Sequence, residues 1–217
     1  MCSTKMCAGI LGVLCLLTPV ITQAADIPLM PYVEAVFPTS EPLSLFCLPD
    51  GTGNPPIEAF NALGQTVDGT LTITLYSEIP PWGDPVPNYP REDIWLMDDF
   101  GQLAVCPGGS IPDANTDAQG RTSWTLPMEL GGHAEPGGDN RLGISISGWD
   151  LYSPGLDDFR LNSSDLDGNR VVNLSDVVLF TRGFYGPYDY SCDFRWDGTV
   201  NLSDLALMAS SLGAACP

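Results

Sequence analysis

Residues 165–176, DLDGNRVVNLSD, and residues 193–204, DFRWDGTVNLSD, are two copies of one short unit. Six of the twelve positions are identical, including the whole VNLSD end, and the copies lie 28 residues apart. An apolar run follows each copy. A duplicated unit is a much stronger signal than a single occurrence, so the repeat predicts one structural element that the chain uses twice.

The spacing of oxygen-bearing residues in each copy fits a calcium-binding loop. Ca²⁺ takes six to eight oxygen ligands, and a twelve-residue loop supplies them from positions 1, 3, 5, 7, 9 and 12. The first copy offers Asp165, Asp167, Asn169, the Val171 carbonyl, Asn173 and Asp176. The second copy offers Asp193, Asp197, the Thr199 carbonyl, Asn201 and Asp204, with Arg195 at position 3. The sequence therefore predicts two calcium sites.

The two copies depart differently from the usual calcium loop. Position 6 is normally glycine because the turn there favours a positive φ. The second copy has Gly198 at that position, whereas the first has Arg170 and carries Gly168 at position 4. Sliding the first copy to bring Gly168 to position 6 would put Leu174 at position 12, which supplies no carboxylate. Because Arg195 replaces a ligand with a cation, we expect the second site to be the weaker one.

A helix is predicted after each loop but not before it. Apolar residues recur at i, i+3 and i+7 after both copies, which is the spacing of one helical face. They are Val177, Phe180 and Phe184 after the first copy, and Leu205, Met208 and Leu212 after the second. The residues before the loops are short and polar or contain a Gly-Pro pair.

This loop-plus-helix tandem resembles the type I dockerin domain over roughly residues 157–217. The resemblance implies calcium-dependent folding, docking onto a cohesin-type protein, and a part in extracellular polysaccharide breakdown. Partner choice would fall to loop positions 10 and 11. These are Leu174 and Ser175 in the first copy, and Leu202 and Ser203 in the second. The identical pairs would allow near-symmetric, two-way binding.

The residues before the tandem predict β-structure. In residues 70–76, Leu71, Ile73 and Leu75 alternate with threonine and tyrosine, as in a strand with one buried face. Seven strands are expected, at 32–37, 43–48, 70–76, 94–97, 103–106, 122–126 and 142–147. Residues 60–76 and 115–124 resemble segments of bacterial immunoglobulin-like surface domains. The expected fold class is therefore an immunoglobulin-like β-sandwich, residues 25–152, plus a small all-α dockerin-like calcium-binding module, residues 153–217.

The first 24 residues have the pattern of a secretory signal peptide. Lys5 precedes a ten-residue apolar run that is too short to span a bilayer, and a small-x-small cleavage pattern ends at Ala24. We therefore expect a secreted, extracellular or cell-surface protein without membrane insertion. Four cysteines remain after cleavage, and an even number in an exported chain favours disulfides. Of three connectivities, pairing within each predicted domain favours Cys47–Cys106 and Cys192–Cys216.

The net charge and the composition exclude several classes of function. With 27 acidic and 8 basic residues the formal net charge is −19, which makes nucleic-acid binding untenable. The single histidine, His133, removes most histidine-based catalysis, and no carboxylate pair stands out as a hydrolase centre. We expect a non-catalytic protein that binds two Ca²⁺ and acts as an attachment or assembly element. Its alternatives are a carbohydrate-binding sandwich that uses Trp82, a self-associating surface fibre or adhesion subunit, and a small hydrolase.

Overall fold

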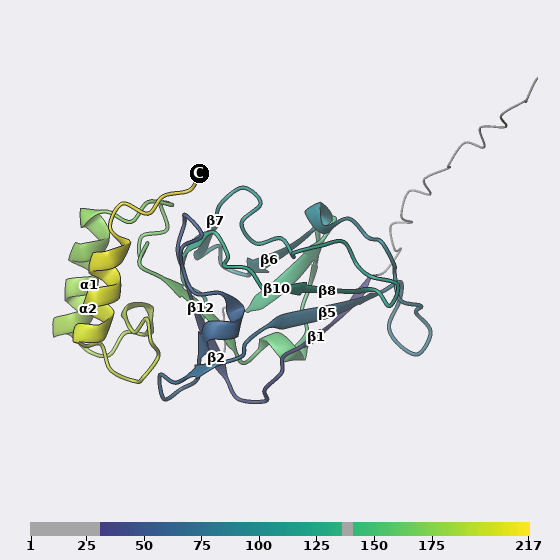
Figure 1. Cartoon of the computed structure of the whole chain (residues 1–217), viewed down its shortest axis with the longest axis horizontal. Helices are drawn as coiled ribbons and strands as arrows, with labels where there is room; N and C mark the ends of the chain where they lie inside the picture. Colours follow the sequence, from purple (N-terminus) through teal and green to yellow (C-terminus); the bar gives the residue numbers. More distant parts are fainter. Residues whose placement is uncertain (1–30, 136–140) are drawn as a thin grey trace, which may run out of the picture.

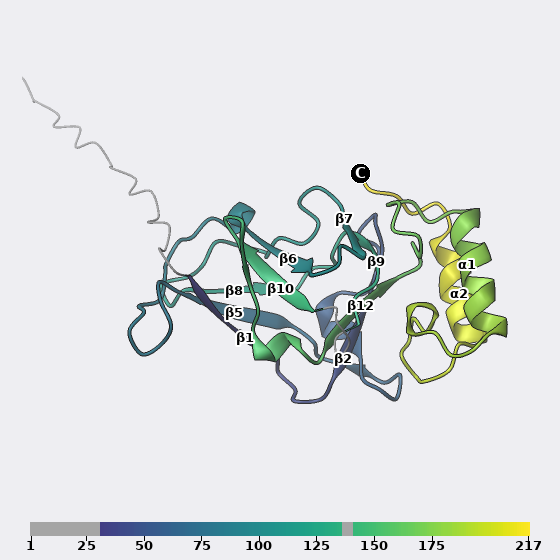
Figure 2. The ribbon, with the colours of Figure 1, turned by 180° about the vertical axis from the view of Figure 1, so that it is seen from behind.

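The computed structural model of the chain describes residues 31–135 and 141–217. The predicted signal peptide, residues 1–24, lies outside them. Most of the regular secondary structure in these residues is β-strand, and two short helices lie side by side at one end (Figures 1 and 2). Within the described ranges, neither helix has the length and apolar character needed to cross a bilayer.

The first sheet shows why alternation in the sequence produces a buried face. It has three antiparallel strands in the order β1-β5-β8, formed by β1 (Tyr32–Val36), β5 (Leu71–Tyr76) and β8 (Arg121–Trp124). Leu71, Ile73 and Leu75 are fully buried, as their period of two predicts.

Two further sheets also contribute to the main apolar core. One has the order β11-β10-β6, with β6 (Ile94–Asp98), β10 (Leu142–Ile146) and β11 (Trp149–Leu151). The other pairs β7 (Leu103–Val105) with β9 (Leu130–Gly132). Short 3₁₀ turns cover Pro56–Glu58, Arg91–Asp93, Pro154–Leu156 and Tyr190–Cys192.

The fourth sheet joins the C-terminal part of the chain to the N-terminal part. Its order is β12-β2-β3-β4, with β2 (Leu43–Cys47), β3 (Ala59–Phe60), β4 (Thr66–Val67) and β12 (Phe159–Ser163). The β12 strand lies parallel to β2 along its full length, from Phe159 opposite Leu43 to Ser163 opposite Cys47. All five residues of β2 are buried because both faces of the strand are covered.

A second apolar core lies between β2 and the helices α1 (Leu174–Tyr185) and α2 (Leu202–Ser211). Phe46 and Phe60 come from strands, and they are buried in one cluster with Phe180 and Phe194. The Phe194 ring centroid lies 5.3 Å from that of Phe46 and 5.6 Å from that of Phe180. The helical pair is therefore packed against strands of its own chain.

The expected fold class, an immunoglobulin-like sandwich plus a small all-α module, is wrong. The strands form four small sheets instead of two packed ones, and β12, within the residues assigned to the all-α module, pairs with β2. The seven predicted strands all exist, but alternation of side chains specifies a strand and not its partner. The strand β12 escaped prediction because Phe159–Ser163 is short and half polar.

The expected disulfide pairing is also wrong. Cys106 is bonded to Cys216, across 110 residues, with 5.6 Å between their Cα atoms. Cys47 and Cys192 are free and buried. Pairing within separate domains presumed that the C-terminal part stands apart. Its packing against the strands instead brings Cys216 to the end of β7.

Candidate metal centre in two repeated loops

The first loop, residues 165–176 and called loop 1 below, begins just after β12 and ends in the first turn of α1. Asp165 and Asp176 are fully buried, and Asp167 is exposed. One carboxylate oxygen of each of these three residues lies within 4.8 Å of the others. In the part of the chain that the structure describes, no other group of three acidic, histidine or cysteine side chains meets this spacing.

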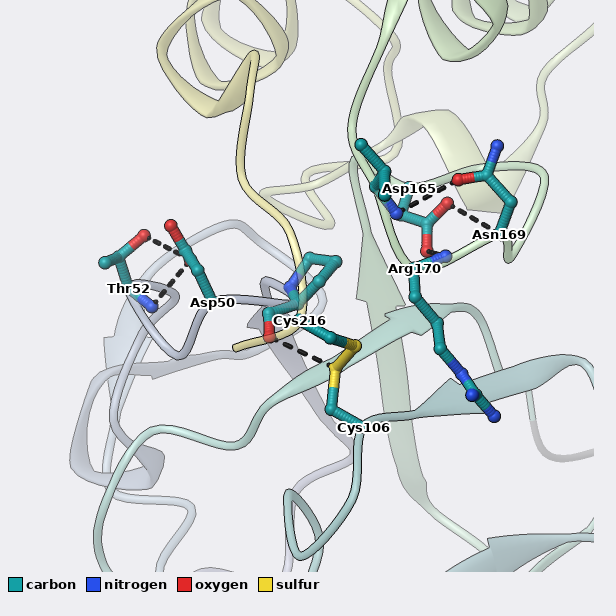
Figure 3. The surroundings of a disulfide bond; sticks show 9 residues. Asp50, Thr52, Cys106, Asp165, Asn169, Arg170 and Cys216 are labelled. Carbon is teal, nitrogen blue, oxygen red and sulfur yellow. Dashed lines mark hydrogen bonds between the residues drawn. A yellow bond between two sulfur atoms is a disulfide. The ribbon is translucent and has the colours of Figure 1, made fainter.

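Backbone N–H groups hold the two buried carboxylates of loop 1 in place. Asn169 N and Arg170 N donate to the two oxygens of Asp165 at 3.1 and 2.7 Å (Figure 3). Asp167 N and Asn173 N donate to the two oxygens of Asp176 at 3.1 and 2.8 Å. A carboxylate has about four acceptor positions, so each group keeps capacity for a cation.

The second loop, residues 193–204 and called loop 2 below, repeats this pattern. Asp193 accepts from Asp197 N and Gly198 N at 3.1 and 2.9 Å. Asp204 accepts from Arg195 N and Asn201 N at 3.2 and 2.9 Å. Both carboxylates are fully buried. The two loops therefore have the same local geometry at positions 1 and 12.

The asparagines at position 9 cap the helices that follow. Asn173 Oδ1 accepts from Ser175 N at 2.8 Å, and Asn201 Oδ1 accepts from Ser203 N at 2.8 Å. Each forms a capping box with the aspartate at position 12, which satisfies otherwise unpaired N–H groups of the first turn. The predicted ligand positions 9 and 12 thus also begin the helices.

The carbonyls at position 7 and the side chains at position 5 face into their own loops. Asn173 Nδ2 donates to the Val171 carbonyl at 3.0 Å, and Asn169 Oδ1 accepts from Val171 N at 3.0 Å. In loop 2, Asn201 Nδ2 donates to the Thr199 carbonyl at 3.2 Å. The position 7 carbonyls and the position 5 side chain of Asn169 are therefore hydrogen-bonded to nitrogen atoms of their own loops.

The backbone of each loop is left-handed at two positions, and sequence reasoning missed one of them. Position 6 has a positive φ in both loops, 70° at Arg170 and 84° at Gly198. Position 4 does too, 67° at Gly168 and 52° at Trp196. Each loop therefore has glycine at one left-handed position and a larger residue at the other, at a cost of about 1–2 kcal/mol for that residue.

Two large side chains of loop 2, Trp196 and Arg195, contact residues outside the loop. The Trp196 ring lies 4.6 Å from the guanidinium carbon of Arg160, a residue of β12. The guanidinium of Arg195 lies over the Phe60 ring, at 5.8 Å. The cation at position 3 therefore reaches toward the strands. Both loops have three carboxylates, but loop 2 has no ligand at position 3 and so offers one ligand fewer than loop 1.

Burial dominates the electrostatics of both loops. Burial, followed by the charge of Asp176, raises the pKa of Asp165 to about 6. Burial also raises the pKa values of Asp193 and Asp204. Clustered buried carboxylates are costly when all are ionised, and a bound divalent cation would offset that cost.

Strands outside the repeat fix the first residue of each loop. Gly132 N in β9 donates to the Asp165 carbonyl at 2.8 Å, and Asn162 Nδ2 in β12 donates to the Asp193 carbonyl at 2.9 Å. A Cβ at Gly131 would lie 1.9 Å from a carboxylate oxygen of Asp165. Sequence reasoning missed these positions because the repeat does not contain them. The only local signal was the Gly-Gly pair itself.

The other singled-out residues are dispersed. Leu174 and Leu202, at the starts of the two helices, are 75% and 71% exposed, Ser175 is exposed and Ser203 is half-buried. Trp82 is 79% exposed. His133 is half-buried, and burial lowers its pKa.

Comparison with known proteins found no relative: no family model, curated protein or solved structure matches this chain. Inference about function therefore depends on the residues and their geometry alone.

Proposed function

We propose that loops 1 and 2 each bind one Ca²⁺, with loop 1 the tighter site, in an exported, non-catalytic protein. The carrying observation is the cluster of Asp165, Asp167 and Asp176 at loop positions 1, 3 and 12. The same arrangement recurs 28 residues later with its buried carboxylates at positions 1 and 12. Every proposed ligand atom in both loops is oxygen, which suits a hard cation better than zinc or copper.

The role of the ion in this proposal is structural. Each loop begins against a strand and ends in a capped helix, and both helices face the second apolar core. An ion bound only by the folded state adds its binding free energy to folding, about 2.7 kcal/mol at a concentration one hundred times Kd. For a chain of this length, each kcal/mol raises Tm by about 2–4 °C.

Calorimetric titration of residues 25–217 with CaCl₂, paired with thermal melts in CaCl₂ and in chelator, tests the proposal. We expect two binding events in the wild type, and one in a variant that combines Asp165→Asn with Asp176→Asn. The exposed Asp157, outside both loops, provides a matched control as Asp157→Asn. A wild type with no heat of binding and equal melting in calcium and chelator would contradict the proposal.

The exposed leucines support the further proposal that the helix starts form an attachment surface. Leu174 and Leu202 occupy equivalent positions of the repeat and point away from the second core. The partner is a cohesin-type protein or a second copy of this chain. Leu174→Glu with Leu202→Glu should abolish capture of a cohesin-bearing partner, or dimerisation in sedimentation, while calcium binding persists. Unchanged association in both assays would reject the surface.

Exposure of Trp82 supports carbohydrate binding as a second candidate. An indole that is 79% exposed can stack on a sugar ring, whereas Trp124 is buried and donates to the Ser110 carbonyl. Glycan-array binding that disappears in Trp82→Ala, but persists in a variant of the half-exposed Trp149, would support this candidate. Binding unaffected by Trp82→Ala would exclude it.

A further inference from the structure

The last residues of the chain run beside the middle of loop 1. Val172 N donates to the Ala214 carbonyl at 2.8 Å, and Cys216 N donates to the Arg170 carbonyl at 3.1 Å. A β-bridge joins Val171 to the residue between them. These bonds cover loop positions 6–8, so the chain end sets the direction of the Val171 carbonyl, the proposed ligand at position 7.

The disulfide fixes this chain end to the same small sheet that holds the start of loop 1. Cys216 is bonded to Cys106, which directly follows β7 (Figure 3). Cys106 N donates to the Glu129 carbonyl at 3.0 Å, just before β9, and Gly132 in β9 donates to the Asp165 carbonyl. Loop 1 is thus held at position 1 and at positions 6–8 by one two-stranded sheet.

Loop 2 has only the first of these two supports. Its position 1 carbonyl, from Asp193, accepts from Asn162. At positions 6 and 7, Gly198 N and Thr199 N donate to aspartates of the loop itself. Within residues 31–135 and 141–217, no backbone hydrogen bond joins positions 6–8 of loop 2 to another segment.

We propose that the Cys106–Cys216 disulfide is a positioning element for calcium binding in loop 1 and not in loop 2. This rests on the calcium function proposed above. The covalent link keeps the chain end on loop 1 before the ion arrives, so less conformational freedom is lost on binding. Because coupling is reciprocal, calcium in loop 1 must in turn favour the intact disulfide over the two thiols.

Site-resolved affinity tests the first half of the proposal. Asp193→Asn with Asp204→Asn leaves loop 1 as the only site, and Asp165→Asn with Asp176→Asn leaves loop 2. Adding Cys106→Ser and Cys216→Ser should weaken calcium binding about tenfold in the first background and less than twofold in the second. An equal loss at both loops would mean general destabilisation, and no loss at loop 1 would mean no coupling; either result overturns the proposal.

Reduction of the native disulfide tests the second half without a cysteine variant. The two thiols of dithiothreitol supply two electrons and two protons, the S–S bond opens to two cysteine thiols, and the reagent closes into a cyclic disulfide. In residues 25–217, alkylation under denaturing conditions then labels four cysteines after reduction and only Cys47 and Cys192 before it. We expect saturating CaCl₂ to slow reduction at least fivefold relative to chelator.

The variants separate this proposal from the calcium function on which it rests. The protection should vanish in Asp165→Asn with Asp176→Asn and persist in Asp193→Asn with Asp204→Asn. Equal reduction rates with and without calcium, in a wild type that binds calcium, would overturn the disulfide proposal alone. Absence of calcium binding in the wild type would instead overturn the proposed function. If the serine variants fail to fold, the reduction measurements decide.

Discussion

Loop 1 and loop 2 have the same length of twelve residues, a capping box and buried carboxylates at positions 1 and 12. They differ in how the rest of the molecule holds them. Loop 1 is held by β9 at its start and by the disulfide-bonded chain end at its middle. Loop 2 is held at its start by Asn162, and Trp196 and Arg195 reach across to the strands.

The comparison teaches that a repeat specifies local geometry, whereas its surroundings specify how firmly that geometry is held. Both loops take a positive φ at positions 4 and 6, although neither has glycine at both. Strain of this kind persists when surrounding contacts over-determine the backbone. The neighbours of a loop, as well as its ligands, should therefore set its affinity.

The largest expected effect comes from neutralising one carboxylate ligand in each loop. Asp165→Asn removes a buried position 1 carboxylate from the three-carboxylate cluster, and calcium affinity at the tighter site should fall by about a hundredfold. Asp197→Asn removes the charge of an exposed ligand in the weaker loop and should change only the weaker binding event. Calorimetric titration measures both. A greater loss of tight binding from Asp197→Asn would reverse the proposed ranking.

Restoring the missing ligand at position 3 of loop 2 should reduce the difference in calcium affinity between the two loops. Arg195→Asp replaces the cation at position 3 with a carboxylate and should tighten loop 2 about tenfold, because affinity follows ligand charge and number. Arg121→Asp makes the same charge change at an exposed site in β8 and serves as the control. An equal gain from both variants would point to the overall field of the chain instead of coordination.

Calcium binding by loop 1 should weaken as the pH falls from 7 to 5. Because the pKa of Asp165 is raised to about 6, protons compete with calcium below that pH, and affinity should fall about tenfold from pH 7 to pH 5. In the absence of calcium, the stability of the folded state should change with pH in the opposite direction. The folded state holds this proton more tightly than the unfolded state, so stability falls as pH rises from about 4 through 6. Titrations and chelator melts across this range measure both. Flat profiles would contradict the raised pKa.

The smallest effect concerns the strained positions. Arg170→Gly should raise the free energy of unfolding by about 0.5–1 kcal/mol, since relief of left-handed strain is partly offset by the greater unfolded-state entropy of glycine. Trp196→Gly should lower it, because the stacking with Arg160 is lost as well. Denaturant unfolding in calcium measures both. Stabilisation by both variants would show that the Trp196 contact contributes little.

The local elements could be predicted from the sequence because their causes are local. Alternation of Leu71, Ile73 and Leu75 predicts β5, and the apolar spacing after each loop predicts the two helices. Their starts at Leu174 and Leu202 follow from the asparagine caps one residue earlier. The acidic cluster of loop 1 follows from the same spacing.

The pairing of strands and cysteines could not be predicted because its causes are distant. The strand β12 is ordinary in sequence and becomes buried only by lying beside β2. Cys106 and Cys216 are separated by 110 residues and meet because the helical pair packs on Phe46 and Phe60. Nothing within either segment encodes those neighbours.

By itself, the sequence determined the two acidic loops, the helices that leave them and the strands that precede them, since short-range hydrogen bonding and periodicity decide such elements. Only the tertiary structure decided which strands pair, which cysteines bond and which loop is braced. Those choices bury apolar surface that comes from distant segments, and the burial of one segment depends on where the others lie.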